Sequence, residues 1–194
     1  MIIAFAALAL LLVPLTGGRL SRLADVRLRA VWLVPVAFGL QLLVISVFPR
    51  ADEGLLAAVH IGTYVLALGF TWVNRSVPGL VLLGLGAALN GVTIALNGGV
   101  LPASARALAR SGFVSDVGEF SNSAVREDAV LPWLGDVFWV PAGWPLANVF
   151  SVGDVLIVAG VAWLAHRVCR SWPGRAAPRL AARARLAVRR PQPG

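Results

Sequence analysis

The chain has 194 residues, of which 58% are hydrophobic and 13% charged, and its formal net charge is +8. Soluble domains usually carry about 25% charged residues, so this composition argues against a water-soluble domain and indicates a lipid bilayer as the solvent. Every basic residue is arginine, and most arginines lie in clusters beside apolar runs. That layout orients membrane helices and argues against a nucleic-acid partner.

Five apolar segments predict about five transmembrane helices, because a bilayer core of about 30 Å needs about 20 helical residues. They run over residues 2–15, 30–48, 55–73, 77–96 and 149–168. The first is short and contains Pro14, so its full crossing is left open. The expected fold class is all-α, a polytopic membrane helical bundle with a structured outer loop.

The arginine distribution predicts the orientation of this bundle, since cytoplasmic loops are enriched in Arg. Arginines cluster between the first and second segments, follow the third, and follow the fifth. We expect a bacterial cytoplasmic (inner) membrane protein with a cytoplasmic C-terminus and membrane lipids as partners. Residues 1–170 would form the bundle, and residues 171–194 a basic tail that is disordered or lies on the membrane surface.

The connection over residues 97–149 is long and is expected to lie outside. Ser104 to Arg110 could form a short amphipathic helix, and residues 112–128 are polar. Residues 131–150 are apolar again and contain three Trp and three Pro. We expect this last part to lie in the outer interface, or to enter the membrane where protein covers its backbone.

Polar residues within the apolar segments concentrate in their predicted outer halves. Polar side chains in a bilayer are unfavourable and are often functional, so the pattern predicts one polar pocket open to the outer face. The candidate substrate-binding residues are Gln41, His60, Asn90, Asn97 and Ser151. The single cysteine, Cys169, excludes a multi-thiolate metal site, and we expect no metal and no cofactor.

Asp154 is the one carboxylate within a predicted span, and Asp136 precedes it by 18 residues. Two carboxyls at one site can share a proton and activate water, as in aspartyl proteases, which makes both residues candidate catalytic groups. A second interpretation stays open, because Ser151-Val152-Gly153-Asp154 also has the pattern of a helix capping box. The two roles are compatible.

The segments Asn97-Gly98-Gly99-x-x-Pro102, Leu134-Gly135-Asp136 and Phe150-Ser151-Val152-Gly153-Asp154 resemble a family of uncharacterised bacterial membrane proteins known only as a domain of unknown function. This resemblance covers most of the chain. It implies a multi-pass membrane protein and supplies no activity.

The stretch from Gly135 to Gly160 is also similar to the C-terminal part of signal peptidase II, the lipoprotein signal peptidase. That resemblance implies catalytic roles for Asp136 and Asp154. The chain departs from the family at Ser151, where the family has Asn, and at Gly153, where it has Ala. The family's Asn-x-x-Asp-Arg motif has no clear counterpart, which argues against a lipoprotein substrate.

Two functions from different classes therefore stay open. The chain could be an aspartyl hydrolase of the outer leaflet that acts on a membrane-anchored peptide or a lipid-linked molecule. Alternatively, it could be a non-catalytic membrane protein that binds or transports a lipid or peptide, or supports a larger assembly.

Overall fold

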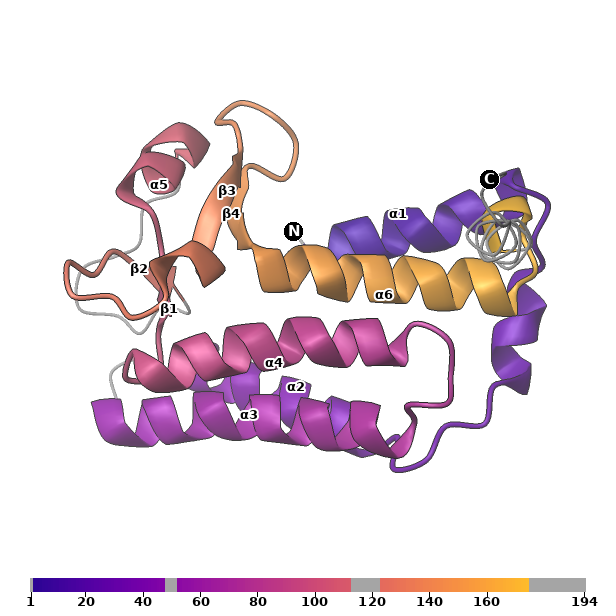
Figure 1. The fold of residues 1–194 in the computed structure, drawn as a ribbon, viewed down its shortest axis with the longest axis horizontal. Helices are drawn as coiled ribbons and strands as arrows, with labels where there is room; N and C mark the ends of the chain where they lie inside the picture. The colour runs from indigo at the N-terminus through magenta and orange to yellow at the C-terminus, as the bar shows by residue number, and fades with distance from the viewer. Residues whose placement is uncertain (1, 48–51, 113–122, 175–194) are drawn as a thin grey trace, which may run out of the picture.

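The computed structural model describes residues 2–47, 52–112 and 123–174, which form eight helices and two small sheets. Figure 1 shows the long helices side by side, with the strands and the short helix α5 gathered at one end. The elements in chain order are α1 (Ile2–Leu15), η1 (Leu20–Asp25), α2 (Leu33–Ser46), α3 (Glu53–Val73), α4 (Leu80–Leu96), β1 (Leu101–Pro102), α5 (Ala105–Ser111), β2 (Ser123–Ala124), η2 (Pro132–Leu134), β3 (Asp136–Val140), β4 (Asn148–Ser151) and α6 (Val152–Val168).

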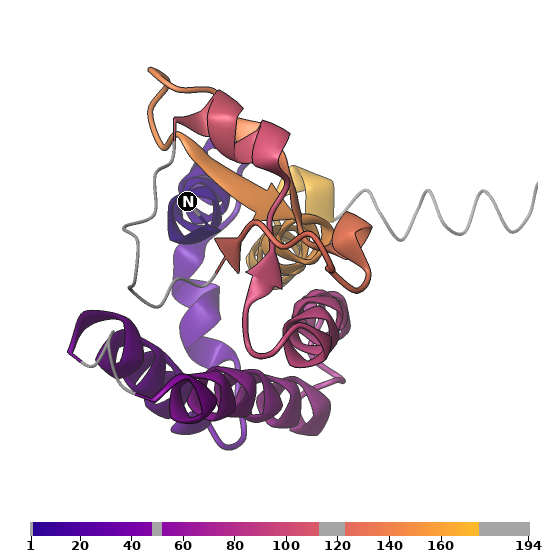
Figure 2. The same cartoon turned by 90° about the vertical axis from the view of Figure 1, so that its left-hand side faces the viewer.

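The long helices pack in the order α1–α6–α4–α3–α2, which differs from their order in the chain. The last long helix, α6, lies between α1 and α4, and α3 lies between α4 and α2. The end-on view in Figure 2 shows the same arrangement, with α5 and the β3–β4 hairpin next to the start of α6. The N-terminus of α6 therefore faces the strands, and its C-terminus lies at the opposite end of the bundle.

The expected all-α fold is confirmed in part: the described residues are mostly helical, but the connection between α4 and α6 also contains two two-stranded sheets. β1 pairs with β2 in parallel, and β3 pairs with β4 antiparallel. The apolar residues 131–150 form η2 and the β3–β4 hairpin, and their expected position in the membrane interface stays a prediction. Val137, Phe138, Trp139 and Val140 explain the difference, since β-branched and aromatic side chains favour strands.

Most predicted helices are found with shifted ends. α1 has the predicted bounds, and the short helix predicted from Ser104 is confirmed as α5, with the Ser104 hydroxyl as its N-cap. α4 begins at Leu80 because Gly79 has φ +88°, outside the helical region. α6 begins at Val152 because residues 148–151 pair as a strand. Of the predicted tail, residues 175–194 lie outside the described residues.

Two buried asparagines join chain connections at opposite ends of the bundle. Asn74, which ends α3, accepts a hydrogen bond from the Arg29 N–H (2.7 Å) and donates to the Arg29 carbonyl (2.9 Å). This contact fixes the connection that leads into α2. Asn97, which ends α4, makes the equivalent connection at the other end, described below.

By length and composition, one described helix, α3, could cross a membrane. α1, residues Leu33–Leu43 of α2, and α4 are apolar but shorter. A helix of 17 residues such as α4 is about 25 Å long at about 1.5 Å per residue. The number of membrane crossings therefore stays a prediction.

α4 and α6 run antiparallel and touch through two pairs of glycines seven residues apart, one of which, Gly79, is the N-cap of α4. Gly86 lies against Gly153, and Gly79 lies against Gly160. A Cβ added at Gly153 would lie 2.7 Å from the Gly86 carbonyl oxygen, and one at Gly160 would lie 2.7 Å from the Leu83 nitrogen. The two backbones are thus in direct contact, as small residues allow between membrane helices.

We expect Gly160→Ala to destabilise the folded protein by about 1–3 kcal/mol, the usual effect of overpacking a tight contact. Gly62→Ala and Gly69→Ala in α3 are matched controls, because an added Cβ meets nothing within 4 Å at either position. Thermal unfolding of the purified chain in detergent measures the difference. Equal midpoints for Gly160→Ala and both controls would contradict the close α4–α6 contact.

Candidate functional site

Strand pairing places Asp136 next to the start of α6. Asp136, the first residue of β3, is the register partner of Ser151, the last residue of β4. Asp136 also bridges Ala103, and its carbonyl accepts the Ser104 N–H at 3.0 Å. Gly135 permits this convergence, because any Cβ there would collide with the Pro102 carbonyl. Three separate chain segments therefore meet at Asp136.

Asp154 lies in a closed hydrogen-bond network with Ser151 and Asn90. Asp154 Oδ2 accepts the Ser151 N–H at 3.0 Å, and the Asp154 N–H donates to Ser151 Oγ at 3.0 Å. The predicted capping box is thereby confirmed. Asn90 of α4 closes the network: its Nδ2 donates to Asp154 Oδ1 at 2.8 Å, and its Oδ1 accepts the Ser151 hydroxyl at 2.9 Å.

Gly153 makes this network possible. An added Cβ would lie in the position that the Asn90 side chain occupies. The departure from signal peptidase II at this residue therefore has a physical reason, since alanine would push Asn90 away from Ser151 and Asp154. All three network side chains are buried, and Ser151 is fully enclosed.

Asp136 has a different environment from Asp154. It is 4% exposed, and its Oδ2 accepts a hydrogen bond from the Ser123 hydroxyl of β2. Its Oδ1 is buried without a hydrogen-bond partner among the described residues. Burial raises the pKa of Asp136 to about 6, against the lowering effect of the Ser123 hydrogen bond, and the charge of Asp154 raises it further. Asp136 therefore holds a proton more readily than an ordinary aspartate.

Tyr64 of α3 is a part of the site that the sequence interpretation missed. Its phenol lies beside Asn90 and within electrostatic range of both Asp154 and Asp136. Gly91 lets α3 approach here, since an added Cβ would lie 3.1 Å from Tyr64 Cβ. The signal was present: Tyr64 is the one tyrosine of the chain and lies one helical turn after His60. No comparable signal marks Ser123, which follows a polar stretch.

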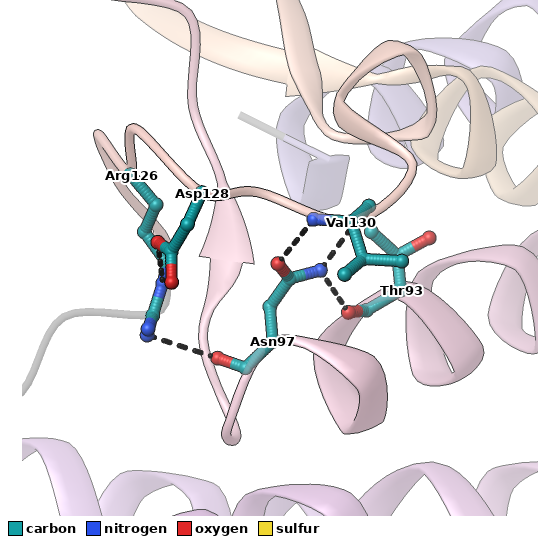
Figure 3. A network of polar contacts seen from close by, with 5 residues as sticks. All are labelled: Thr93, Asn97, Arg126, Asp128 and Val130. Atoms are coloured by element: carbon teal, nitrogen blue, oxygen red, sulfur yellow. Dashed lines mark hydrogen bonds and ion pairs between the residues drawn. The ribbon is translucent and has the colours of Figure 1, made fainter.

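Asn97, a predicted substrate-binding residue, uses its amide to hold the outer connection against α4 (Figure 3). Its Nδ2 donates to the carbonyls of Thr93 (2.7 Å) and Val130 (2.8 Å), and its Oδ1 accepts the Val130 N–H at 2.9 Å. Arg126 donates to the Asn97 carbonyl at 3.1 Å and lies 3.7 Å from Asp128. Asn97 therefore fixes the position of the segment around Val130 relative to the end of α4.

His60 and Gln41 make their hydrogen bonds with other partners. His60 Nδ1 lies 2.6 Å from the Gly99 carbonyl, which joins α3 to the turn after α4. The Thr63 hydroxyl lies 3.0 Å from Gln41 Oε1, which joins α3 to α2. Of the predicted site residues, the structure thus brings together Asp136, Asp154, Asn90 and Ser151. Within the described ranges, no three His, Cys, Asp or Glu residues are placed to hold a metal ion.

The arrangement has the components of acid–base chemistry. Asp154 is surrounded by donors that stabilise a carboxylate, whereas Asp136 has one hydroxyl partner and an oxygen without one. Environments that differ in this way allow one carboxyl to act as a base while the other holds a proton.

Comparison with known proteins identifies the family of the chain. A model for a family of unknown function (DUF5317) matches residues 25–166. The chain is 33% identical over 154 residues to an uncharacterized protein of Thermotoga maritima, an alignment that covers 79% of this chain and 83% of that protein. No solved structure shows significant similarity to the chain. The resemblance to a domain of unknown function is thereby confirmed.

The pKa of Asp136 predicts a specific pH dependence of stability. Between pH 3.8 and about 6 the unfolded chain releases this proton while the folded chain retains it, so the free energy of unfolding falls as pH rises. The full change is about 3 kcal/mol at about 1.4 kcal/mol per pKa unit. Below and above this range Asp136 contributes no pH dependence.

We expect Asp136→Asn to remove this decrease, because asparagine does not titrate. Thermal unfolding midpoints measured from pH 4 to 7 would show a smaller decline for Asp136→Asn than for the wild type. Asp128→Asn is the matched control, since its side chain is 83% exposed. The same pH slope in all three proteins would rule out the raised pKa.

Proposed function

The chain belongs to DUF5317, a family of unknown function, and we propose that it is a multi-pass membrane hydrolase with Asp136 and Asp154 as its acid–base pair. In this proposal α1, α2, α3, α4 and α6 span the bacterial cytoplasmic membrane. The strands and α5 form an outer cap, and the C-terminus lies in the cytoplasm. The substrate is a membrane-anchored peptide or a lipid-linked molecule.

The distribution of side chains supports the membrane part of the proposal. Among the described residues, buried polar side chains are as numerous as buried apolar ones. Large apolar side chains instead cover the outer surfaces of the helices, as Phe38, Val65 and Val81 illustrate. Exposed apolar surface on this scale marks contact with another phase or molecule, and lipid is the phase that long apolar helices fit.

The convergence of two buried carboxyls is the observation that carries the proposed activity. Asp136 is the strand partner of Ser151, whose N–H binds Asp154, so β3 and α6 bring both carboxyls to one site. In the proposed reaction Asp154 accepts a proton from water, and the resulting hydroxide attacks the substrate carbonyl. Protonated Asp136 donates its proton to the carbonyl oxygen as the tetrahedral intermediate forms. When the intermediate collapses, Asp154 gives the proton taken from water to the leaving group, and Asp136 recovers its proton as the carbonyl re-forms.

Asn90 and Ser151 are positioning residues in this mechanism, because they hold the Asp154 carboxylate. The resemblance to signal peptidase II assigns the same two acids, and it stays a prediction. Substrate stabilisation by Asn90, Asn97, His60 and Gln41 likewise stays a prediction.

An apolar cleft beside the site favours a substrate with a hydrocarbon part. The cleft has a volume of about 450 Å³ and lies mainly between α2 and α3, where Phe38 and Ala67 line it. Tyr64 lines the same cleft and also lies beside Asn90. A molecule with its chain in the cleft would therefore have its polar end near the carboxyls.

The hydrogen bonds of Asp154 favour a second candidate function, a non-catalytic membrane protein that binds a lipid or peptide in this cleft. Both carboxylate oxygens of Asp154 accept hydrogen bonds within the protein, which is the pattern of a structural cap. In that case Asp154 stabilises the start of α6, and no bond in the ligand is broken.

Activity measurements distinguish the two functions. Membrane vesicles containing the full chain are incubated with endogenous membrane peptides and lipids, and the released products are quantified by mass spectrometry. We expect Asp136→Asn and Asp154→Asn to lower product release by about 10²–10⁴-fold, the usual contribution of acid–base groups. Asp128→Asn should match the wild type.

Folded protein in the membrane is measured in the same samples. Unchanged product release with Asp136→Asn would overturn the hydrolase and leave the binding function. Loss of folded protein with both Asp154→Asn and Ser151→Ala would assign Asp154 to capping.

The proposed orientation is tested with reporter fusions. A phosphatase reporter that functions only outside the cytoplasm should be active when inserted at Gly143, in the β3–β4 loop, where an added Cβ meets nothing within 4 Å. The same reporter after Gly194 should be inactive, and a fluorescent reporter there should be bright. The opposite result would overturn the orientation.

A further inference from the structure

A polar pocket lies at the end of the bundle remote from the two carboxyls. It has a volume of about 380 Å³. One wall is formed by η1 and Val26, and the other by the C-terminal end of α6 and Arg170. Figure 1 shows these elements at the opposite end from the strands. Its lining residues are Arg22, Asp25, Val26, Val168 and Arg170. The function proposed above makes no use of this pocket.

The pocket carries excess positive charge. Arg22 and Arg170 provide two guanidinium groups against the one carboxylate of Asp25. Among the residues that the structure describes, neither guanidinium forms an ion pair with a carboxylate. Guanidinium groups bind phosphate oxygens through paired, charge-assisted hydrogen bonds. The pocket therefore has the chemistry of an anion site, and phosphate is one anion that guanidinium pairs bind well.

Backbone hydrogen bonds hold the walls of the pocket together. The Arg19 N–H, just before η1, donates to the Cys169 carbonyl at 3.0 Å, and the Trp172 N–H donates to the Thr16 carbonyl at 2.9 Å. Between these contacts Arg170 adopts a left-handed conformation with φ +52°, which turns the chain after α6. The two arginines are thus placed by the fold.

Exposed apolar side chains belong to the chain segments next to this charged pocket. Leu15 and Leu20, at the end of α1 and the start of η1, are 80% and 42% exposed, and Trp172 is 69% exposed. Trp is common at the depth of lipid headgroups. A cationic pocket with exposed apolar residues in the neighbouring segments matches an amphiphile, whose phosphate and hydrocarbon chains need both kinds of contact. Basic pockets on the cytoplasmic side of membrane proteins bind anionic headgroups in this way.

We propose that Arg22 and Arg170 form a binding site for a phosphate group, carried by an anionic phospholipid of the cytoplasmic leaflet. The phosphate lies between the two guanidinium groups, and the acyl chains lie along Leu15 and Leu20. The lipid as carrier rests on the proposed membrane location, whereas the phosphate chemistry rests on the pocket alone.

The purified full chain in mixed phosphatidylglycerol–phosphatidylcholine nanodiscs provides the test. Native mass spectrometry counts the phosphatidylglycerol molecules retained after release from the nanodisc. We expect the double variant Arg22→Gln/Arg170→Gln to lower this retention by about tenfold or more, since a tenfold change corresponds to about 1.4 kcal/mol, which is less than one charge-assisted hydrogen bond contributes. Asp25→Asn should raise retention, because it removes the one acid of the pocket.

Arg29→Gln/Arg75→Gln is the matched control, with the same change in net charge at the same end of the bundle. The Arg29 side chain does not line the pocket, and the Arg75 guanidinium lies over the Trp72 ring. The site is supported if this control retains phosphatidylglycerol and the pocket variant Arg22→Gln/Arg170→Gln loses it. Equal loss of phosphatidylglycerol in both variants, or in neither, overturns the lipid as the carrier of the phosphate.

Inorganic phosphate distinguishes the carrier. The unfolding midpoint is measured with inorganic phosphate in detergent solution for the wild type and for Arg22→Gln/Arg170→Gln. If phosphate raises the midpoint of the wild type alone while both proteins retain the same amount of lipid, the ligand of the site is a soluble phosphate compound and not a lipid. Because none of these measurements involves Asp136 or Asp154, failure of this site is distinguishable from failure of the proposed hydrolase.

Discussion

Backbone contact between α4 and α6 is the constraint on which the rest of the site depends. The two helices meet where Gly86 faces Gly153 and where Gly79 faces Gly160, without side chains between them. Asn90 lies one turn beyond Gly86, so the short separation lets its amide reach both Ser151 and Asp154. A larger residue at either glycine pair would separate the helices and leave buried polar groups without partners.

The network at the start of α6 also explains why the strands are ordered around it. Ser151 belongs both to β4 and to the capping box, so the strand ladder and the helix share a residue. Since Asp136 is the strand partner of Ser151, the position of one carboxyl is tied to the cap that holds the other. This shared residue makes catalytic and structural roles for Asp154 compatible.

The motif residues that resemble the family of unknown function have separate physical roles. Gly99 has φ +91° and lies against Ala57, which only glycine permits, and its carbonyl lies 2.6 Å from His60 Nδ1. Gly135 lets β3 approach Pro102, and Gly153 accommodates Asn90. These glycines are needed for close packing around the site, whereas Asp136 and Asp154 are its two buried carboxyl groups.

The sequence alone predicted the apolar helices, the short helix α5 and the capping box at Ser151, because each follows from a local pattern of hydrophobicity or capping residues. It also singled out Asp136, Asp154, Asn90 and Ser151. The strands, the packing order of the helices, and the parts played by Tyr64, Ser123 and Asn97 were decided only by the tertiary structure. Strand register and helix packing join residues far apart in the chain, such as Asn90 and Asp154, and no local pattern records which distant segments will meet.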